Sequence, residues 1–207
     1  PIRISETPRL FIVSIHSSGE REGCIKKYEE ALDIFNSALE ACSLESRPIY
    51  WARTKSNIGI SLLKIGTLMH GTVELKNATH AIRAALEVFH AVKPRTEWAS
   101  VQNNLASALL IIGRRKNSTM ILQQALHECR TAVKVSTPEI TPFKWALRQE
   151  NLAIAAFDLF LRTADEEHHK EAKLSIDAAL TVYRKAGADY HIEGAERLQA
   201  RIAAAGE

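Results

Sequence analysis

Apolar side chains recur at intervals of three and four residues along most of the chain, the spacing that places them on one face of an α-helix. Within residues 96–113 this apolar stripe consists of Trp98, Val101, Leu105, Leu109 and Ile112. Within residues 118–135 a second stripe consists of Ile121, Leu122, Ala125, Leu126, Cys129, Ala132 and Val133. The sequence therefore predicts two amphipathic helices that follow one another with a short connection.

This pair of helices is repeated along the chain with a period of 47 residues. The three tryptophans, Trp51, Trp98 and Trp145, lie 47 residues apart, as do Asn57, Asn104 and Asn151. Two alanine positions keep the same spacing: Ala31, Ala78, Ala125 and Ala172, and then Ala38, Ala85, Ala132 and Ala179. A fixed period of this length is typical of helix pairs that stack on one another around a continuous core. Alanine at fixed positions lets neighbouring helices approach closely, whereas a larger side chain would overpack the contact by about 1–3 kcal/mol.

The period divides residues 19–207 into a helical domain of three repeats, at about 48–94, 95–141 and 142–188. A half repeat at residues 20–43 precedes them and a capping helix at 189–204 follows, so we expect an all-α fold of about seven helices. Pro48 and Pro142 lie where first helices begin, a position that tolerates the missing N–H. Thr96 and Thr141 are candidate N-caps, and Gly66 and Gly113 are candidate left-handed C-caps.

Residues 1–18 form a different segment. They contain a dense β-branched and aromatic run at residues 9–15, RLFIVSI, which favours a strand or an extended segment. Such a segment could lie along the helices, pair with its copy in a dimer, or be the tail of an upstream domain. The chain begins with Pro1 rather than methionine, which is consistent with a piece of a longer protein.

Composition and charge narrow the function classes only slightly. The net charge of +3 gives no electrostatic argument for nucleic-acid binding, and no apolar run is long enough to span a membrane. Cys24, Cys42 and Cys129 are too few for a disulfide framework or a zinc site, so a reducing compartment is the simpler expectation. Repeat style and cysteine use together suggest the bacterial cytoplasm.

No motif in the sequence predicts catalysis, a cofactor or a metal site. The chain lacks a glycine-rich phosphate loop, a Gly-x-Ser-x-Gly elbow and a His-Glu-x-x-His motif. The run of Glu166, Glu167, His168 and His169 has metal-ligating residue types, but adjacent helical residues point in different directions and do not converge on one ion. The tryptophans could form an aromatic ladder for bases or sugars; sealing one repeat against the next is the favoured interpretation.

The repeated motif resembles the tetratricopeptide repeat. In the second copy the resemblance is carried by Trp98, Ala99, Asn104, Leu105, Leu109, Gly113, Ala125, Cys129, Ala132 and Val133, and it extends over about residues 20–204. The repeat here is 13 residues longer than the usual unit of about 34. This long form is similar to extended arrays in bacterial multidomain proteins and to kinesin-light-chain repeats. The resemblance implies a right-handed superhelical solenoid of antiparallel helix pairs, in which the first helices line a concave groove.

The resemblance also implies a set of groove residues. Asn57, Asn104 and Asn151 would hydrogen-bond the backbone of a bound peptide; alternatively, each would bond an adjacent helix and fix the stacking. The other groove positions implied are Arg53, Ile60, Lys64, Asn103, Ser107, Glu150 and Ile154. Because Arg53 and Lys64 are the only basic residues in this predicted lining, capture of an acidic C-terminus is not expected. An extended or helical segment that is held by apolar anchors fits better, with Ile60, Leu63, Leu110 and Phe157 as the anchors.

The function expected from these features is non-catalytic protein–protein interaction, with a protein or peptide partner in the groove. Two alternatives remain open. The chain could be a self-assembly module that forms a homodimer, because solenoid ends expose stacking surfaces and the Phe11–Ile15 run could pair between chains. It could instead be the regulatory portion of a larger signalling enzyme.

Overall fold

The computed structural model describes residues 18–69, 71–92 and 95–206, and these residues form eight α-helices and no strand. The helices are α1 (Ser18–Glu40), α2 (Pro48–Leu68), α3 (Val73–Val92), α4 (Arg95–Arg115), α5 (Thr119–Val135), α6 (Pro142–Thr163), α7 (Glu166–Lys185) and α8 (Asp189–Ala204). The all-α prediction is confirmed, but the expected count of about seven is one too low. Three repeats supply six helices, and each half repeat adds one more. The predicted extended segment lies outside the described residues, except for Ser18, which begins α1.

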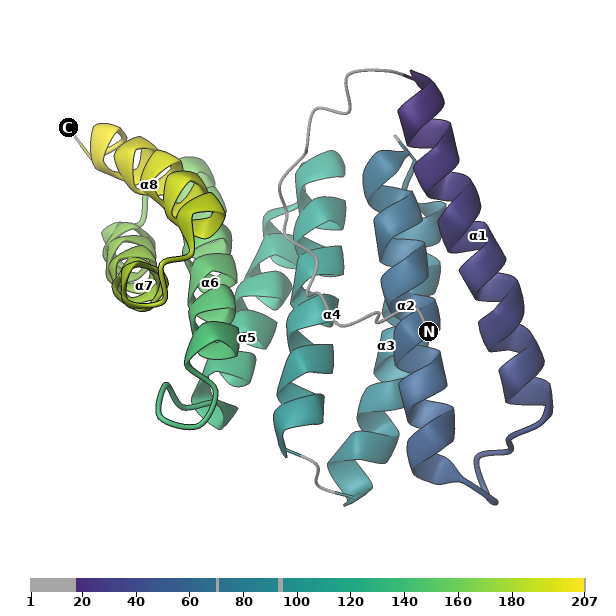
Figure 1. Ribbon diagram of the computed structural model, residues 1–207. Helices are drawn as coiled ribbons and strands as arrows, with labels where there is room; N and C mark the ends of the chain where they lie inside the picture. The colour runs from purple at the N-terminus through teal and green to yellow at the C-terminus, as the bar shows by residue number, and fades with distance from the viewer. Residues whose placement is uncertain (1–17, 70, 93–94, 207) are drawn as a thin grey trace.

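The helices pack in adjacent pairs, as Figure 1 shows. The most extensive contacts are within the pairs α2–α3, α4–α5 and α6–α7, and each pair also contacts the next through α3–α4 and α5–α6. The backbone of α2 approaches that of α4, α4 approaches α6, and α6 approaches α8. The backbones of α3, α5 and α7 do not approach one another in this way. The first helices of the pairs therefore form the more closely spaced of two layers.

Gly66 and Gly113 allow close packing within a pair and do not end their helices, so the predicted glycine C-caps are wrong. Helix α2 continues to Leu68 and α4 continues to Arg115. A Cβ on Gly66 would lie 2.7 Å from Leu75 Cδ2, and one on Gly113 would lie 2.8 Å from Leu122 Cδ2. Glycine is needed here because the second helix crosses where a side chain would otherwise stand.

The helix N-termini confirm the proline prediction but not the threonine one. Pro48 and Pro142 occupy the first turns of α2 and α6, as expected. Thr141 is the N-cap residue of α6, but its side chain makes no capping hydrogen bond, and Thr96 lies inside α4. Ser118 caps α5 by accepting a hydrogen bond from the backbone N–H of Ile121. Asp165 caps α7 in the same way, at 3.0 Å from the Glu167 nitrogen.

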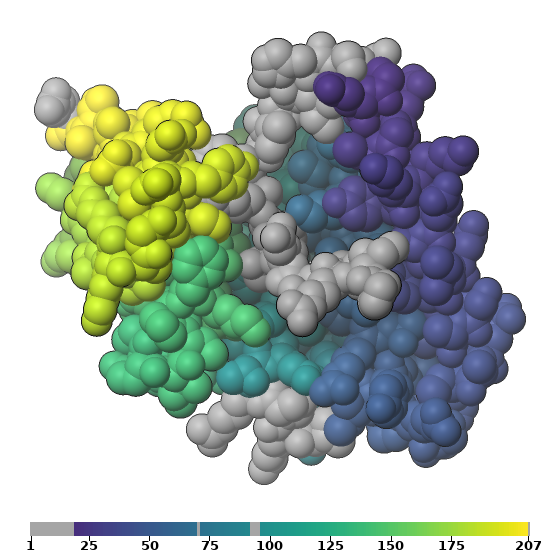
Figure 2. Space-filling view, viewed as in Figure 1, coloured from purple at the N-terminus to yellow at the C-terminus, as the bar shows by residue number. Residues whose placement is uncertain are grey.

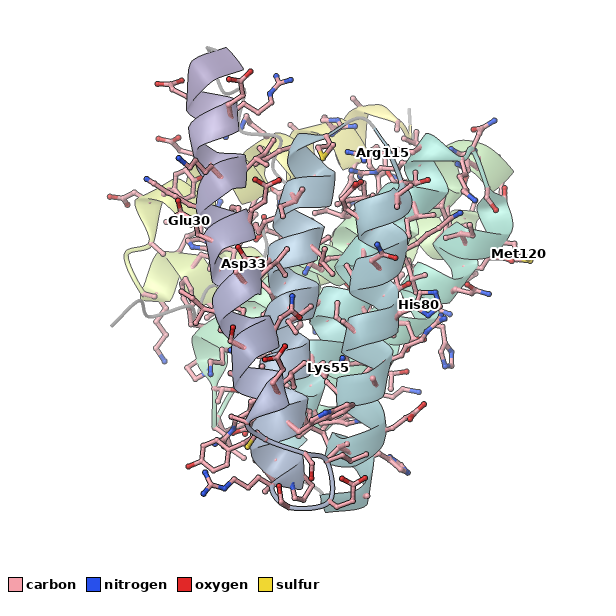
Figure 3. All side chains as sticks on the ribbon, turned by 90° about the vertical axis from the view of Figure 1, so that its right-hand side faces the viewer. Glu30, Asp33, Lys55, His80, Arg115 and Met120 are labelled. Carbon is pink, nitrogen blue, oxygen red and sulfur yellow. The ribbon has the colours of Figure 1, made fainter. Side chains whose placement is uncertain are left out.

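Arg115, at the end of α4, joins two consecutive repeats. Its Nη1 donates to the carbonyl oxygens of Gly66 (2.7 Å) and Gly71, and its Nη2 donates to that of Thr67 (3.2 Å). Figure 3 labels Arg115, which lies beside the end of α2. The last carbonyls of a helix lack partners within the helix, so a cation there satisfies both the hydrogen bonds and the helix dipole. Arg162, one period later, donates to Asn117 Oδ1 and so makes a similar link between repeats.

We expect Arg115→Ala to lower the free energy of unfolding by about 1–2 kcal/mol, because the carbonyls at the end of α2 lose their charged donor. Urea denaturation followed by circular dichroism measures this change. The matched control is Lys116→Ala, which removes an exposed cation from the next position and should change stability by less than about 0.5 kcal/mol. Equal effects of the two substitutions would show that the Arg115 link between repeats contributes nothing.

Candidate functional site

The first helices face the viewer in Figure 2, and side chains from neighbouring first helices meet along a polar seam. Arg53 Nε donates to Glu97 Oε2 at 3.3 Å, and Arg114 Nη2 donates to Asp158 Oδ1 at 3.0 Å; each pair is 44 residues apart. A second type of contact joins residues 48 apart: Arg148 to Ser100, and Asn151 to Asn103. The predicted groove positions Arg53, Asn103 and Asn151 therefore each contact a neighbouring first helix.

A pocket of about 380 Å³ lies between α2 and α4 on this first-helix face. Four of the predicted groove residues line it, namely Arg53, Asn57, Ile60 and Asn104. Ser100 of α4 and Lys144 from the first turn of α6 also contribute to the wall, together with the aromatic ring of Phe89 from α3. The pocket thus combines apolar surface with amide, hydroxyl and charged groups, a composition that suits a ligand with both apolar and polar parts.

The three asparagines of the repeated column have different environments. Asn57 is half-buried in the pocket wall, and Asn104 is 3% exposed there, with no hydrogen-bond partner for its Oδ1. Asn151 instead donates from Nδ2 to Asn103 Oδ1 at 3.0 Å, across the seam between α6 and α4. Asn151 therefore makes the contact that the stacking interpretation describes, whereas Asn57 and Asn104 face a space that a ligand could fill.

The other predicted groove residues do not line this pocket. Ser107 is buried and donates to the Asn103 carbonyl within its own helix, and Ile154 is buried in the core. Glu150 is buried as well, and its Oε2 accepts a hydrogen bond from the Tyr183 hydroxyl at 2.7 Å. Lys64 is half-buried on α2.

Three of the four expected apolar anchors belong to the core, so that part of the prediction is wrong. Leu63, Leu110 and Phe157 are 0%, 1% and 3% exposed, and they belong to the buried apolar clusters between the helices. The reason is that a first helix packs against second helices on both sides, which widens its buried face beyond a single stripe. Ile60 is half-buried in the pocket wall and is the one of the four that borders open space.

Sequence reasoning missed Arg148, which is 2% exposed in α6. Its Nη2 donates to Ser100 Oγ at 2.9 Å, while its Nε and Nη1 have no hydrogen-bond partner. Burial lowers the pKa of its guanidinium to about 10, because the charged form loses its hydration. A signal was present in the repeat: Arg148 stands 47 residues after Val101, so an arginine occupies a position that is apolar in the preceding copy.

Within the residues that the structure describes, no group of three or more histidine, cysteine or acidic side chains could hold a metal ion. In the Glu166–His169 run, His169 Nε2 lies 2.8 Å from the carbonyl oxygen of Ile202, where it joins α7 to α8. Trp51, Trp98 and Trp145 are half-buried and pack against the core, as the sealing interpretation expects. Among the described helices, none combines the length and the apolar character that crossing a bilayer requires.

A second pocket, of about 420 Å³, opens on the side of the second helices and contains none of the predicted groove residues. Arg130 of α5 and Glu171 of α7 border it and are joined by two hydrogen bonds of 2.7 and 2.8 Å.

Comparison of the chain with protein-family models, with curated proteins and with solved structures gives no significant match.

Proposed function

We propose that this chain is a non-catalytic protein-interaction module, in which the helix pairs form a tetratricopeptide-like right-handed solenoid and the first-helix face binds a peptide segment of a partner protein. The pocket between α2 and α4 is the proposed binding site. The observation that carries the proposal is Asn104, which lines this pocket and whose buried Oδ1 has no hydrogen-bond partner among the described residues.

A buried acceptor without a partner destabilises the protein by about 1–3 kcal/mol, so a donor from a ligand would recover that free energy on binding. The backbone N–H of a peptide is such a donor. Asn57, one repeat earlier in the same pocket, offers a second carboxamide that can both donate and accept. Ile60, which is half-buried, adds apolar surface for one side chain of the peptide.

The layer of first helices supports an extended ligand rather than a compact one. Asn57 on α2 and Asn104 on α4 are equivalent positions 47 residues apart, and both line the pocket, so a ligand that crosses from α2 to α4 meets two carboxamides in succession. A peptide in an extended conformation presents its backbone groups at regular intervals, which matches a repeated row of polar side chains.

The test is selection of binding peptides from a random dodecamer library displayed on phage, with the full chain immobilised. We expect selected peptides, synthesised with a fluorescent label, to bind in fluorescence anisotropy. The double substitution Asn57→Ala and Asn104→Ala should weaken their binding by at least about tenfold, since each lost hydrogen bond contributes about 0.5–1.5 kcal/mol.

The matched control is Asn77→Ala, which removes an exposed carboxamide on α3, away from the pocket, and should leave the affinity unchanged. Both variants should keep the helical circular dichroism of the wild type. If the library yields no binding peptide, or if the selected peptides bind the double variant as well as the wild type, peptide recognition in this pocket is wrong.

A further inference from the structure

The seam between α4 and α6 contains buried hydrogen-bond donors that outnumber its acceptors. Ser100 and Asn103 lie about one turn apart on α4, and each contacts a residue of α6, namely Arg148 and Asn151. Three donor nitrogens in this seam have no partner: Nε and Nη1 of Arg148 and Nδ2 of Asn103. Arg148 and Asn103 are 2% and 0% exposed, so bulk water does not replace the missing acceptors.

Among the residues that the structure describes, no acidic side chain of the seam is left to neutralise Arg148. Glu97 receives two hydrogen bonds from Arg53, and Asp158 receives two from Arg114. Arg148 donates to a neutral group, the hydroxyl of Ser100. That hydroxyl in turn donates to the carbonyl oxygen of Thr96. A buried, unpaired guanidinium is strongly unfavourable, and a structure that retains one gains free energy when an anion binds it.

The pocket between α2 and α4 comes within one side chain of this charge, because Arg148 does not line the pocket but its hydrogen-bond partner Ser100 does. Ser100 lines the pocket and accepts the hydrogen bond from Arg148, so the guanidinium lies directly behind the pocket wall. Lys144, one helical turn before Arg148 on α6, also lines the pocket. Of the charged groups here, Arg53 and Glu97 neutralise each other, so Arg148 and Lys144 leave the site with a net positive charge.

We propose that the ligand of this module carries a carboxylate, which binds Arg148 and Asn103 Nδ2 in the seam between α4 and α6. This inference rests on the proposed function for the identity of the ligand as a peptide, but the anion site is defined by the chain's own residues. A carboxylate matches one edge of the planar guanidinium, that of Nε and Nη2, as the carboxylates of Glu97, Asp158 and Glu171 do with their own arginines, and a remaining lone pair can accept from Asn103 Nδ2. A monoanion also matches the single buried charge, because Lys144 is exposed and keeps its hydration.

The first experiment uses acetate as the probe and requires no peptide. Sodium acetate is compared with sodium chloride at equal ionic strength, for the wild type and for Arg148→Met, a substitution that removes the buried charge and keeps a long side chain. We expect acetate at about 100 mM to raise the melting temperature of the wild type by about 1–3 °C and that of the variant by less than half as much. Equal shifts in the two proteins would mean a general salt effect and would overturn the proposal.

A nuclear magnetic resonance titration keeps the proposal testable even if Arg148→Met does not fold. In the wild type, the Nε–H resonance of Arg148 should move to lower field as acetate is added, and the shift should saturate. Lys116→Ala, which removes an exposed cation far from the seam, should show the same titration. An Arg148 Nε–H resonance that does not move would overturn the proposal.

The second experiment uses the peptides selected from the dodecamer library and tells this inference apart from the proposed function. Replacement of each Asp or Glu by its amide, and separately amidation of the C-terminus, show which carboxylate is bound. One of these changes should weaken wild-type binding by at least about tenfold and have little effect on Arg148→Met. If peptides bind and none of these changes weakens binding, the carboxylate site is wrong and the proposed function stands. If no peptide is selected but acetate binds at Arg148, the anion site stands and peptide recognition is wrong.

Discussion

Leu122→Ala is expected to lower the free energy of unfolding by about 2–5 kcal/mol. Leu122 lies in α5, is 0% exposed, and belongs to the large apolar cluster that joins the repeats. Removing three carbons loses their transfer free energy and leaves a cavity that the rigid helix pair fills only in part. Urea denaturation followed by circular dichroism measures the loss.

The control for this substitution is Leu174→Ala in α7. Leu174 is also a leucine of a second helix, but it is 62% exposed, so its truncation should change stability by no more than about 0.5 kcal/mol. A loss of less than about 1 kcal/mol for Leu122→Ala would mean that the interior of the α4–α5 pair is not closely packed, and would contradict the structure described above.

Gly113→Ala is expected to destabilise the protein by about 1–3 kcal/mol, although alanine favours a helix over glycine by about 1 kcal/mol. The new Cβ would lie 2.8 Å from Leu122 Cδ2, 2.9 Å from Leu122 Cγ and 3.2 Å from the Leu122 backbone nitrogen. Relief of these contacts therefore requires α4 and α5 to separate as well as the Leu122 side chain to turn. The same denaturation experiment gives the free energy of unfolding.

Gly23→Ala in α1 is the matched control, because a Cβ at that position meets no atom within 4 Å. It should raise stability by about 0.5–1 kcal/mol, since only the helix preference remains. A gain of stability for Gly113→Ala would instead restore the interpretation that glycine there is a dispensable helix end.

The effects of Leu122→Ala and Gly113→Ala on stability should also be coupled. In a Leu122→Ala background the side chain that the Gly113 Cβ would strike is gone, so Gly113→Ala should lose most of its cost. A double-mutant cycle measures this coupling, which we expect at about 1–2 kcal/mol. Additive effects would show that the two residues do not contact each other in solution.

The repeat pattern predicted the helices, their pairing and most of the core. Ala78, Ala125 and Ala172 occupy the same position of successive repeats and are all 0% exposed, as that position requires. Ala31 occupies the same column but is only half-buried, and Ala38 is exposed. Within the described residues α1 packs against α2 alone, so the side that a partner helix covers in the other copies is open in α1. A column therefore predicts burial only where the neighbouring helix is present.

The candidate site was predictable in part. Arg53, Asn57, Ile60 and Asn104 were expected on the first-helix face and do line its pocket. Ser107, Glu150 and Ile154 were expected there too, but they are buried outside it. The rotation of each first helix about its axis decides which of these neighbours faces the open space. That rotation is set by two flanking second helices, and a single helix's sequence does not encode it.

The sequence by itself determined the helices and their order, because a helix and its buried stripe depend on residues three and four positions apart. Only the tertiary structure decided the roles of Gly113 and Arg148. Contacts across the seam join residues 44 and 48 apart, so they depend on how far one helix pair is shifted along the next. That shift results from the packing of whole surfaces, and it places Arg148, a cation without an acidic partner among the described residues, behind a pocket, at a position where the other copies have Thr54 and Val101.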